Sequence, residues 1–284
     1  MNPTFGVSTW LWTSPFTTET VALFPRIREM GFSVVEIPAE YPELIDGKAV
    51  KAALDAAGLT AVVCAALGPS RDLTHEDPQV HTDTLAYLRA CMDLCLAVGA
   101  TFVAGPLYSA VGKARQLPPD KRQAEWDLAV RNLHTASQMA AERGLLLALE
   151  PLNRFESDLV NTAADAVRLV EDIGHPAAKV MLDSFHMSIE ERDPGAALRQ
   201  AAPYLIHLQV SENHRGIPGT GQTPWQAYRS ALQDMNYQGV ISIESFTPEV
   251  KELAGAVCIW KPFAPDQDYF ARTGLSFLQQ TFQS

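Results

Sequence analysis

Short apolar runs alternate with longer amphipathic segments along the whole chain. Several of the amphipathic segments repeat their apolar residues at helical spacing, among them residues 20–31, 49–58, 85–100 and 125–144. Several also close on a glycine, which is typical of a helix C-terminus; these are Gly31, Gly58, Gly99, Gly144 and Gly174. The eight predicted strands are residues 4–10, 33–38, 60–67, 101–108, 145–152, 179–185, 205–211 and 239–246.

Strands that are apolar almost throughout and are separated by helices indicate a parallel sheet covered on both faces. Eight strand and helix units in 284 residues match the size of a (β/α)8 barrel, the TIM barrel. A doubly wound open sheet should show a glycine-rich turn after an early strand, and the sequence has none. With no linker or shift in composition, we expect residues 1–284 to form a single TIM barrel domain.

Three of the last four predicted strands end on a carboxylate. The fifth ends at Glu150, the sixth at Asp183 and the eighth at Glu244. The C-terminal ends of all barrel strands meet at one mouth, so these three side chains should lie close together. Three neighbouring anions repel each other unless a cation lies among them. Hard oxygen ligands favour Mn²⁺, with Mg²⁺ or Co²⁺ as the other candidates.

The seventh strand offers two candidates for a fourth ligand, His207 and Gln209. Residues two apart on a strand face the same side, so both can point into the barrel. Imidazole is the more general ligand, but Gln209 lies nearer the mouth and its amide oxygen suits a hard ion. We favour Gln209 and place His207 one layer deeper as a supporting residue.

Composition and charge exclude several classes of function. The net charge of −11 argues against a nucleic-acid-binding surface, which needs basic residues. None of the four cysteines forms a CxxC pair, which favours reduced thiols. The sequence lacks a signal peptide pattern and an apolar run of about 18 residues, so we expect a cytoplasmic protein with no membrane association.

Three more polar residues follow the predicted ligands in the loops above the barrel. Glu156 comes six residues after Glu150, His186 three after Asp183 and Arg215 six after Gln209. Each alone is compatible with an ordinary surface charge or a buried histidine. Together, above a metal, they are typical of groups that bind the hydroxyls of a polyol.

These motifs resemble the sugar epimerases and isomerases of the xylose isomerase-like superfamily, in particular the D-tagatose 3-epimerase and D-psicose (allulose) 3-epimerase group. The similar segments are ALEPLNRFE (148–156), MLDSFHM (181–187), SENHRGIPGTG (211–221) with Trp225, and SIESF (242–246). That family binds Mn²⁺ or Co²⁺ through two Glu, one Asp and one His. The resemblance implies Glu150, Asp183 and Glu244 as ligands here, and the family's His falls on Gln209.

The resemblance also implies a reaction, the inversion of carbon 3 of a ketose through an enediolate. Glu150 and Glu244 would flank that carbon, one removing a proton and the other returning one to the opposite face. Glu156, His186 and Arg215 would hold the oxygens on carbons 1 to 3. Barrels of this family usually form dimers or tetramers, so a homodimer or homotetramer is implied.

Other residues and reactions stay open at the level of sequence. Glu36, Trp10, Trp12 and Cys64 are candidates for the pocket wall, although packing explains them equally well. The superfamily also includes dehydratases of the 3-dehydroshikimate type and inosose or hydroxypyruvate-type isomerases. A non-catalytic sugar-binding protein is the alternative from another class. Few basic residues are expected at the mouth, which favours a free sugar over a sugar phosphate.

Overall fold

Eight parallel strands close into a barrel in which each strand pairs with its neighbours in chain order and β1 pairs with β8. The computed structural model describes residues 3–283. The fold is the predicted (β/α)8 barrel. The strands are β1 (Thr4–Ser8), β2 (Val34–Pro38), β3 (Thr60–Cys64), β4 (Phe102–Gly105), β5 (Leu146–Leu149), β6 (Ala178–Asp183), β7 (Leu205–Val210) and β8 (Val240–Ile243).

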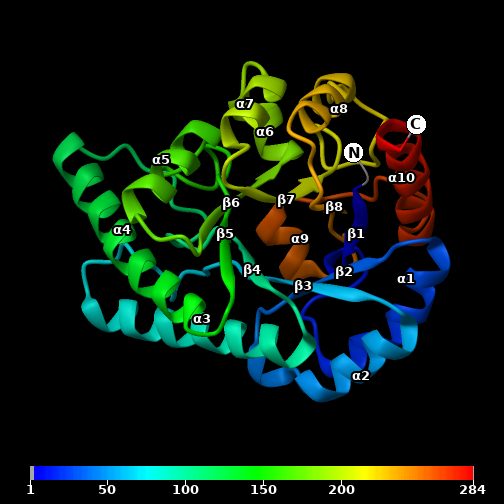
Figure 1. Cartoon of the computed structure of the whole chain (residues 1–284), viewed down its shortest axis with the longest axis horizontal. Helices are drawn as coiled ribbons and strands as arrows, with labels where there is room; N and C mark the ends of the chain where they lie inside the picture. The colour runs from blue at the N-terminus through cyan, green and yellow to red at the C-terminus, as the bar shows by residue number, and fades with distance from the viewer. Residues whose placement is uncertain (1–2, 284) are drawn as a thin grey trace.

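Ten α-helices are present in residues 3–283. Most of them surround the strands, while α9 lies over the middle of the barrel in the view of Figure 1. Most of the connections between consecutive strands contain one helix, as a parallel barrel requires. The helices are α1 (Phe24–Met30), α2 (Gly47–Ala57), α3 (Pro78–Val98), α4 (Pro119–Ala141), α5 (Ala163–Ile173), α6 (Ser184–Glu190), α7 (Pro194–Ala201), α8 (Trp225–Asp234), α9 (Lys251–Val257) and α10 (Gln267–Phe282).

Most predicted strands extend beyond the observed ones at their C-terminal ends. At residues 184–185 the type of element differs. They were predicted as strand, and in the structure they are the first two residues of α6. The reason is Asp183, whose side chain accepts a hydrogen bond from the backbone N–H of Phe185 and so caps the helix. The chain therefore changes from strand to helix at Asp183 itself.

Four of the five glycines expected at helix ends are confirmed there. Gly31, Gly58, Gly99 and Gly174 follow α1, α2, α3 and α5 in the left-handed conformation, which a residue without Cβ adopts easily. Gly144 also has a positive φ of 68°, but α4 already ends at Ala141.

Alternate residues of the strands face two different environments. One set, which includes Val35, Val63 and Leu147, belongs to the large apolar core. The other set forms a small separate cluster with Val34, Val62, Cys64, Ala104, Ala148 and Met181. Val34, Ala148 and Met181 each lie two residues before a polar residue of the mouth and so face the same side, and the cluster fills the barrel interior beneath those residues. Within residues 3–283, no helix is long and apolar enough to cross a membrane.

Candidate active site

The three predicted carboxylates all lie at the C-terminal ends of barrel strands and are at most 5% exposed. Asp183 is the last residue of β6, and Glu150 and Glu244 come one residue after β5 and β8. The backbone N–H of Glu150 donates to the Gly105 carbonyl oxygen at 3.0 Å. Gly105 has a φ of 136°, and a Cβ there would overlap the Ala65 carbonyl oxygen, so the turn that supports Glu150 requires glycine.

Arg215 joins two of these carboxylates from the loop that follows β7. Its Nη1 donates to Asp183 Oδ2 and, at 2.8 Å, to Glu244 Oε2. The guanidinium also lies over the rings of Phe185 and Phe246, at 4.1 and 5.2 Å from their centroids. Arg215 is 6% exposed, so a buried positive charge lies among the buried negative ones.

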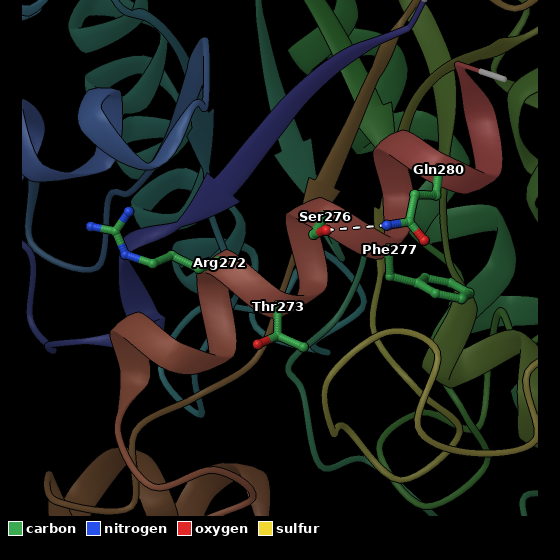
Figure 2. A pocket seen from close by; sticks show the side chains of 5 residues that line it. All are labelled: Arg272, Thr273, Ser276, Phe277 and Gln280. Atoms are coloured by element: carbon green, nitrogen blue, oxygen red, sulfur yellow. Dashed lines mark hydrogen bonds between the residues drawn. The ribbon is translucent and has the colours of Figure 1, made fainter.

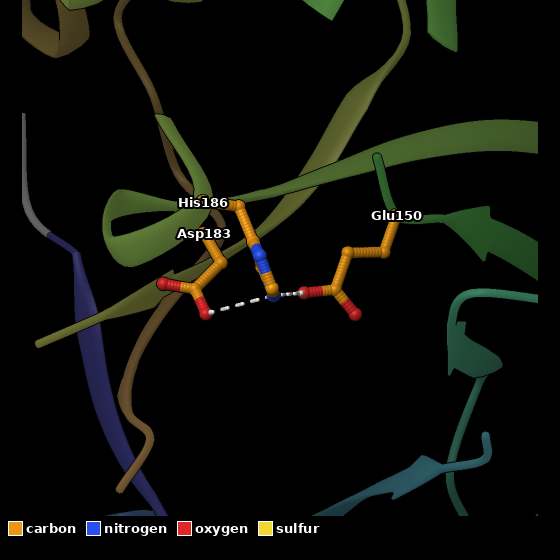
Figure 3. A group of neighbouring side chains, drawn as sticks. All are labelled: Glu150, Asp183 and His186. Atoms are coloured by element: carbon orange, nitrogen blue, oxygen red, sulfur yellow. Dashed lines mark ion pairs between the residues drawn. The ribbon is translucent and has the colours of Figure 1, made fainter. Parts of the chain in front are cut away.

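His186, from the first turn of α6, lies between two carboxylates (Figure 3). Its Nε2 is 3.6 Å from Glu150 Oε1 and 3.9 Å from Asp183 Oδ2, and the three residues form a group that could hold a metal ion. The backbone N–H of Asn153 donates to His186 Nδ1 at 3.0 Å. Arg215 Nη2, which can only donate, lies 3.2 Å from His186 Nε2, so the ring lies against a guanidinium as well as the two carboxylates.

The carboxyls differ in the direction of their pKa shifts. Burial raises the pKa of Glu150 well above its ordinary value, and Glu244 and Asp183 add to the rise. Burial also raises the pKa of Glu244, although Arg215 opposes that rise. For Asp183 burial acts in the same direction, but Arg215 and His186 outweigh it and the pKa is lowered. Asp183 is thus held as a carboxylate, while burial opposes a negative charge on Glu150 and Glu244 unless a cation balances it.

Gln209 and His207 lie on β7 at the two depths expected from their spacing. Gln209 is paired in register with Asp183, and His207 with Met181 in the barrel interior. Both are bonded to Glu36 of β2: His207 Nε2 is 2.7 Å from Glu36 Oε1, and Gln209 Nε2 is 2.8 Å from Glu36 Oε2. Among residues 3–283, Gln209 Oε1 has no hydrogen-bond partner although it is buried.

The remaining predicted residues are spread between the mouth and the periphery. Glu156 accepts from Asn153 Nδ2 at 2.7 Å, which ties it to the residue that also holds His186. Cys64 lies in the barrel interior, where burial and then Glu36 raise the pKa of its thiol. Trp10 packs on Phe246, with ring centroids 5.6 Å apart. Trp12 instead donates to Asp268 at 2.9 Å.

Two supporting residues were not predicted from the sequence. Asn153 fixes His186 and Glu156 together, and its only signal was its place in the segment ALEPLNRFE. Glu212 organises the loop that carries Arg215. It accepts from Trp225 Nε1 at 2.7 Å, from the Gly219 N–H at 2.6 Å and from the Thr223 N–H at 3.0 Å. In the sequence, nothing distinguished Glu212 from an ordinary carboxylate in a surface loop.

Replacing Glu212 with Gln is expected to lower the free energy of unfolding by about 2 kcal/mol at pH 7, because charge-assisted bonds are lost. Burial acts to raise the pKa of Glu212, but the bonds from Trp225 and Thr223 lower it. This stabilisation is therefore present above the ordinary pKa and is lost as the pH falls through the lowered one.

Denaturant unfolding at pH 7 and at pH 3 measures the effect, with Glu252→Gln on the exposed face of α9 as the control. The difference between the wild type and the Glu212→Gln variant should be smaller at pH 3. A variant as stable as the wild type at pH 7 would contradict this role.

A further pocket of about 410 Å³ lies along α10 (Figure 2), where Phe277 of its wall packs on Trp225 with ring centroids 5.4 Å apart. Ser276 and Gln280 are hydrogen-bonded to each other on its wall, at 3.4 Å. None of its lining residues is among those predicted for the site. The lining residues are Arg272, Thr273, Ser276, Phe277 and Gln280.

Known proteins with similar sequences share the whole barrel. The family described as xylose isomerase-like TIM barrel matches residues 24–278. A probable ketose 3-epimerase of Synechocystis sp. is 34% identical, over 99% of this chain and 97% of the relative. A D-psicose 3-epimerase of Agrobacterium fabrum is 30% identical, over 89% and 90%.

A solved structure gives the same result for the fold. The D-allulose 3-epimerase from Methylomonas sp. superposes with a TM-score of 0.92 at 27% identity, over 99% of this chain and 98% of that one. The match runs through the barrel and the loops that carry the buried carboxylates. This chain belongs to the xylose isomerase-like TIM barrel family.

Proposed function

We propose that the protein is a divalent-metal-dependent ketose 3-epimerase that acts on a free ketohexose or ketopentose. The observation that carries this proposal is the pair of buried glutamates, Glu150 and Glu244, at the ends of β5 and β8. Both have raised pKa values, and Asp183 lies near both of them. Relatives at 30–34% identity over most of the chain bear the names of ketose and D-psicose 3-epimerases.

In this proposal the two glutamates divide the proton transfers between the two faces of carbon 3. One carboxylate removes the hydrogen of carbon 3, and the electron pair moves to the carbonyl to give an enediolate. The other carboxyl then donates a proton to the opposite face, which inverts the carbon. A carboxyl group within hydrogen-bond reach of the carbon can serve as the base in one step and as the acid in the other.

The donor set fits a hard divalent cation. Glu150, Asp183 and Glu244 supply carboxylate oxygens, and Gln209 Oε1 is a buried oxygen that no other group within residues 3–283 uses. We propose Mn²⁺, with Mg²⁺ or Co²⁺ as alternatives. When bound, such an ion would supply positive charge that stabilises the enediolate.

The remaining polar groups of the mouth would hold the sugar. His186 presents its ring at the mouth, and Glu156 and Arg215 supply an acceptor and donors for hydroxyls on carbons 1 to 3. Arg215 is already bonded to two carboxylates, which leaves little free positive charge for a phosphate and favours a free sugar. A homodimer or homotetramer, a single domain and a cytoplasmic location stay predictions.

Incubation of metal-free protein with free ketoses tests the proposal directly. The chelated protein should be inactive, and added Mn²⁺ should restore interconversion of carbon-3 epimers among D-fructose, D-psicose, D-tagatose, D-sorbose, L-ribulose and D-xylulose. Chromatography separates the epimers and ranks the substrates. The untreated protein, assayed in parallel, controls for damage by the chelator.

Turnover that persists after complete removal of metal would contradict the metal requirement. Tight Mn²⁺ binding without turnover of any ketose would overturn the epimerase proposal. The same preparation would then be assayed as a dehydratase of 3-dehydroshikimate type and as an inosose or hydroxypyruvate isomerase.

A further inference from the structure

Glu36, on β2, is a fully buried carboxylate near the centre of the barrel, and the shorter way round the closed sheet from β2 to β7 passes through β1 and β8. Its two oxygens have different partners. Oε1 is bonded to His207 Nε2 at 2.7 Å and Oε2 to Gln209 Nε2 at 2.8 Å. Burial of a carboxylate is costly unless both oxygens are satisfied, and β7 supplies both donors.

These contacts determine the orientation of the Gln209 amide. A carboxylate accepts hydrogen bonds and cannot donate them, so the group that faces Glu36 must be the NH₂ of the amide. The same argument places the hydrogen of His207 on Nε2. Because the NH₂ of Gln209 faces Glu36, the amide oxygen of Gln209 lies at the opposite edge of the planar amide group.

That oxygen is buried and has no hydrogen-bond partner anywhere in residues 3–283. Gln209 and Asp183 are paired in register on β7 and β6, so the amide lies directly beside one of the proposed ligands. If the amide were reversed, its NH₂ would occupy this position and would repel a cation. The amide orientation that Glu36 fixes therefore favours a cation at this position.

We propose that Glu36 is a positioning residue that holds the Gln209 amide with its oxygen available to the divalent cation. This inference rests on the metal site of the proposed function and adds a residue to it. Glu36 acts through Gln209, and His207 satisfies the second oxygen of Glu36, so that the carboxylate cannot turn away from Gln209. Mutation of a residue that orients a metal ligand typically weakens metal binding by about 10- to 100-fold.

The test is Mn²⁺ binding to chelator-treated protein. Binding is measured as the loss of the electron paramagnetic resonance signal of free Mn²⁺. Glu36→Leu removes both acceptor oxygens at similar size, and we expect its Kd for Mn²⁺ to rise by about 10- to 100-fold. Gln209→Leu should weaken binding to a similar extent. Glu40→Leu is the control, because Glu40 is on the segment after β2 and accepts from Ser14 and the Phe16 N–H instead.

A double-mutant cycle distinguishes positioning from general destabilisation. If Glu36 acts through Gln209, adding Glu36→Leu to Gln209→Leu should weaken Mn²⁺ binding no further. Additive effects, or wild-type affinity in folded Glu36→Leu, would overturn the inference. If the circular dichroism spectrum of Glu36→Leu departs from that of the wild type, Glu36→Met replaces it. Met also lacks both acceptor oxygens, so unchanged affinity in folded Glu36→Met overturns the inference equally.

The outcomes also separate this inference from the proposed function. A wild-type protein that binds Mn²⁺ and epimerises ketoses, with unchanged affinity in the Glu36 variants, refutes only the role of Glu36. A wild-type protein that binds Mn²⁺ but turns over no ketose refutes the epimerase, while the affinity comparison still tests Glu36. Absence of Mn²⁺ binding in the wild type overturns both.

Discussion

Replacing Glu244 with Gln is expected to reduce kcat for carbon-3 epimerisation by about a thousandfold, within the range for loss of a general acid or base. The amide has nearly the same shape and keeps an oxygen near the cation site, but it neither removes nor returns a proton. Glu244 is 5% exposed and lies at the C-terminal end of β8, where the mouth of the barrel would place it against the substrate. The measurement is the rate of epimer formation at saturating Mn²⁺.

Isotope exchange shows whether one face of the carbon has lost its acid or base. In deuterated water, the Glu150 carboxyl that remains should still exchange the carbon-3 hydrogen of one of the two epimers, without inversion. Metal occupancy must be measured in the same samples, to separate the loss of a base from the loss of a ligand. Glu171→Gln, on α5 and bonded to Tyr204, is the matched control. A fully loaded Glu244→Gln protein with a kcat within tenfold of the wild type would contradict the two-base proposal.

The fold could be predicted from the sequence because barrel strands carry a strong local signal. Strand β7, for example, lies within the predicted residues 205–211, and its apolar residues alternate with polar ones that face the barrel interior. Residues 184–185 show where this signal fails. Ser184 and Phe185 continue the composition of a strand, but the cap made by the Asp183 side chain starts a helix there.

Candidate residues at the mouth could be proposed from sequence because barrel geometry brings all strand ends together. To predict Glu150, Asp183 and Glu244 as neighbours, it was enough to locate the ends of β5, β6 and β8 in the sequence. The bonds between side chains could not be foreseen in the same way. Glu36 lies 171 and 173 residues from its two partners on β7, and their contact depends on barrel closure and register. The bridge that Arg215 makes depends on a loop whose shape is set by the bonds to Glu212.

Replacing Arg215 with Met is expected to destabilise the metal-free protein by about 3 kcal/mol, because removing one partner from a buried ion pair leaves uncompensated charge. Arg215 Nη1 is shared by Asp183 and Glu244, and all three residues are at most 6% exposed. Added Mn²⁺ supplies positive charge to the same carboxylates. We therefore expect Mn²⁺ to raise the melting temperature of the variant by more than it raises that of the wild type.

Thermal unfolding with and without Mn²⁺ tests this expectation. For a chain of this size the loss corresponds to a fall in Tm of roughly 6–12 °C without metal, at about 2–4 °C per kcal/mol. Arg199→Met is the matched control, because Arg199 pairs with Asp234 on the surface and such pairs contribute less than about 1 kcal/mol. A Tm decrease in Arg215→Met that is the same with and without Mn²⁺ would mean that the guanidinium acts through packing on Phe185 and Phe246. Recovery by Mn²⁺ would mean that guanidinium and metal ion balance the same buried charges.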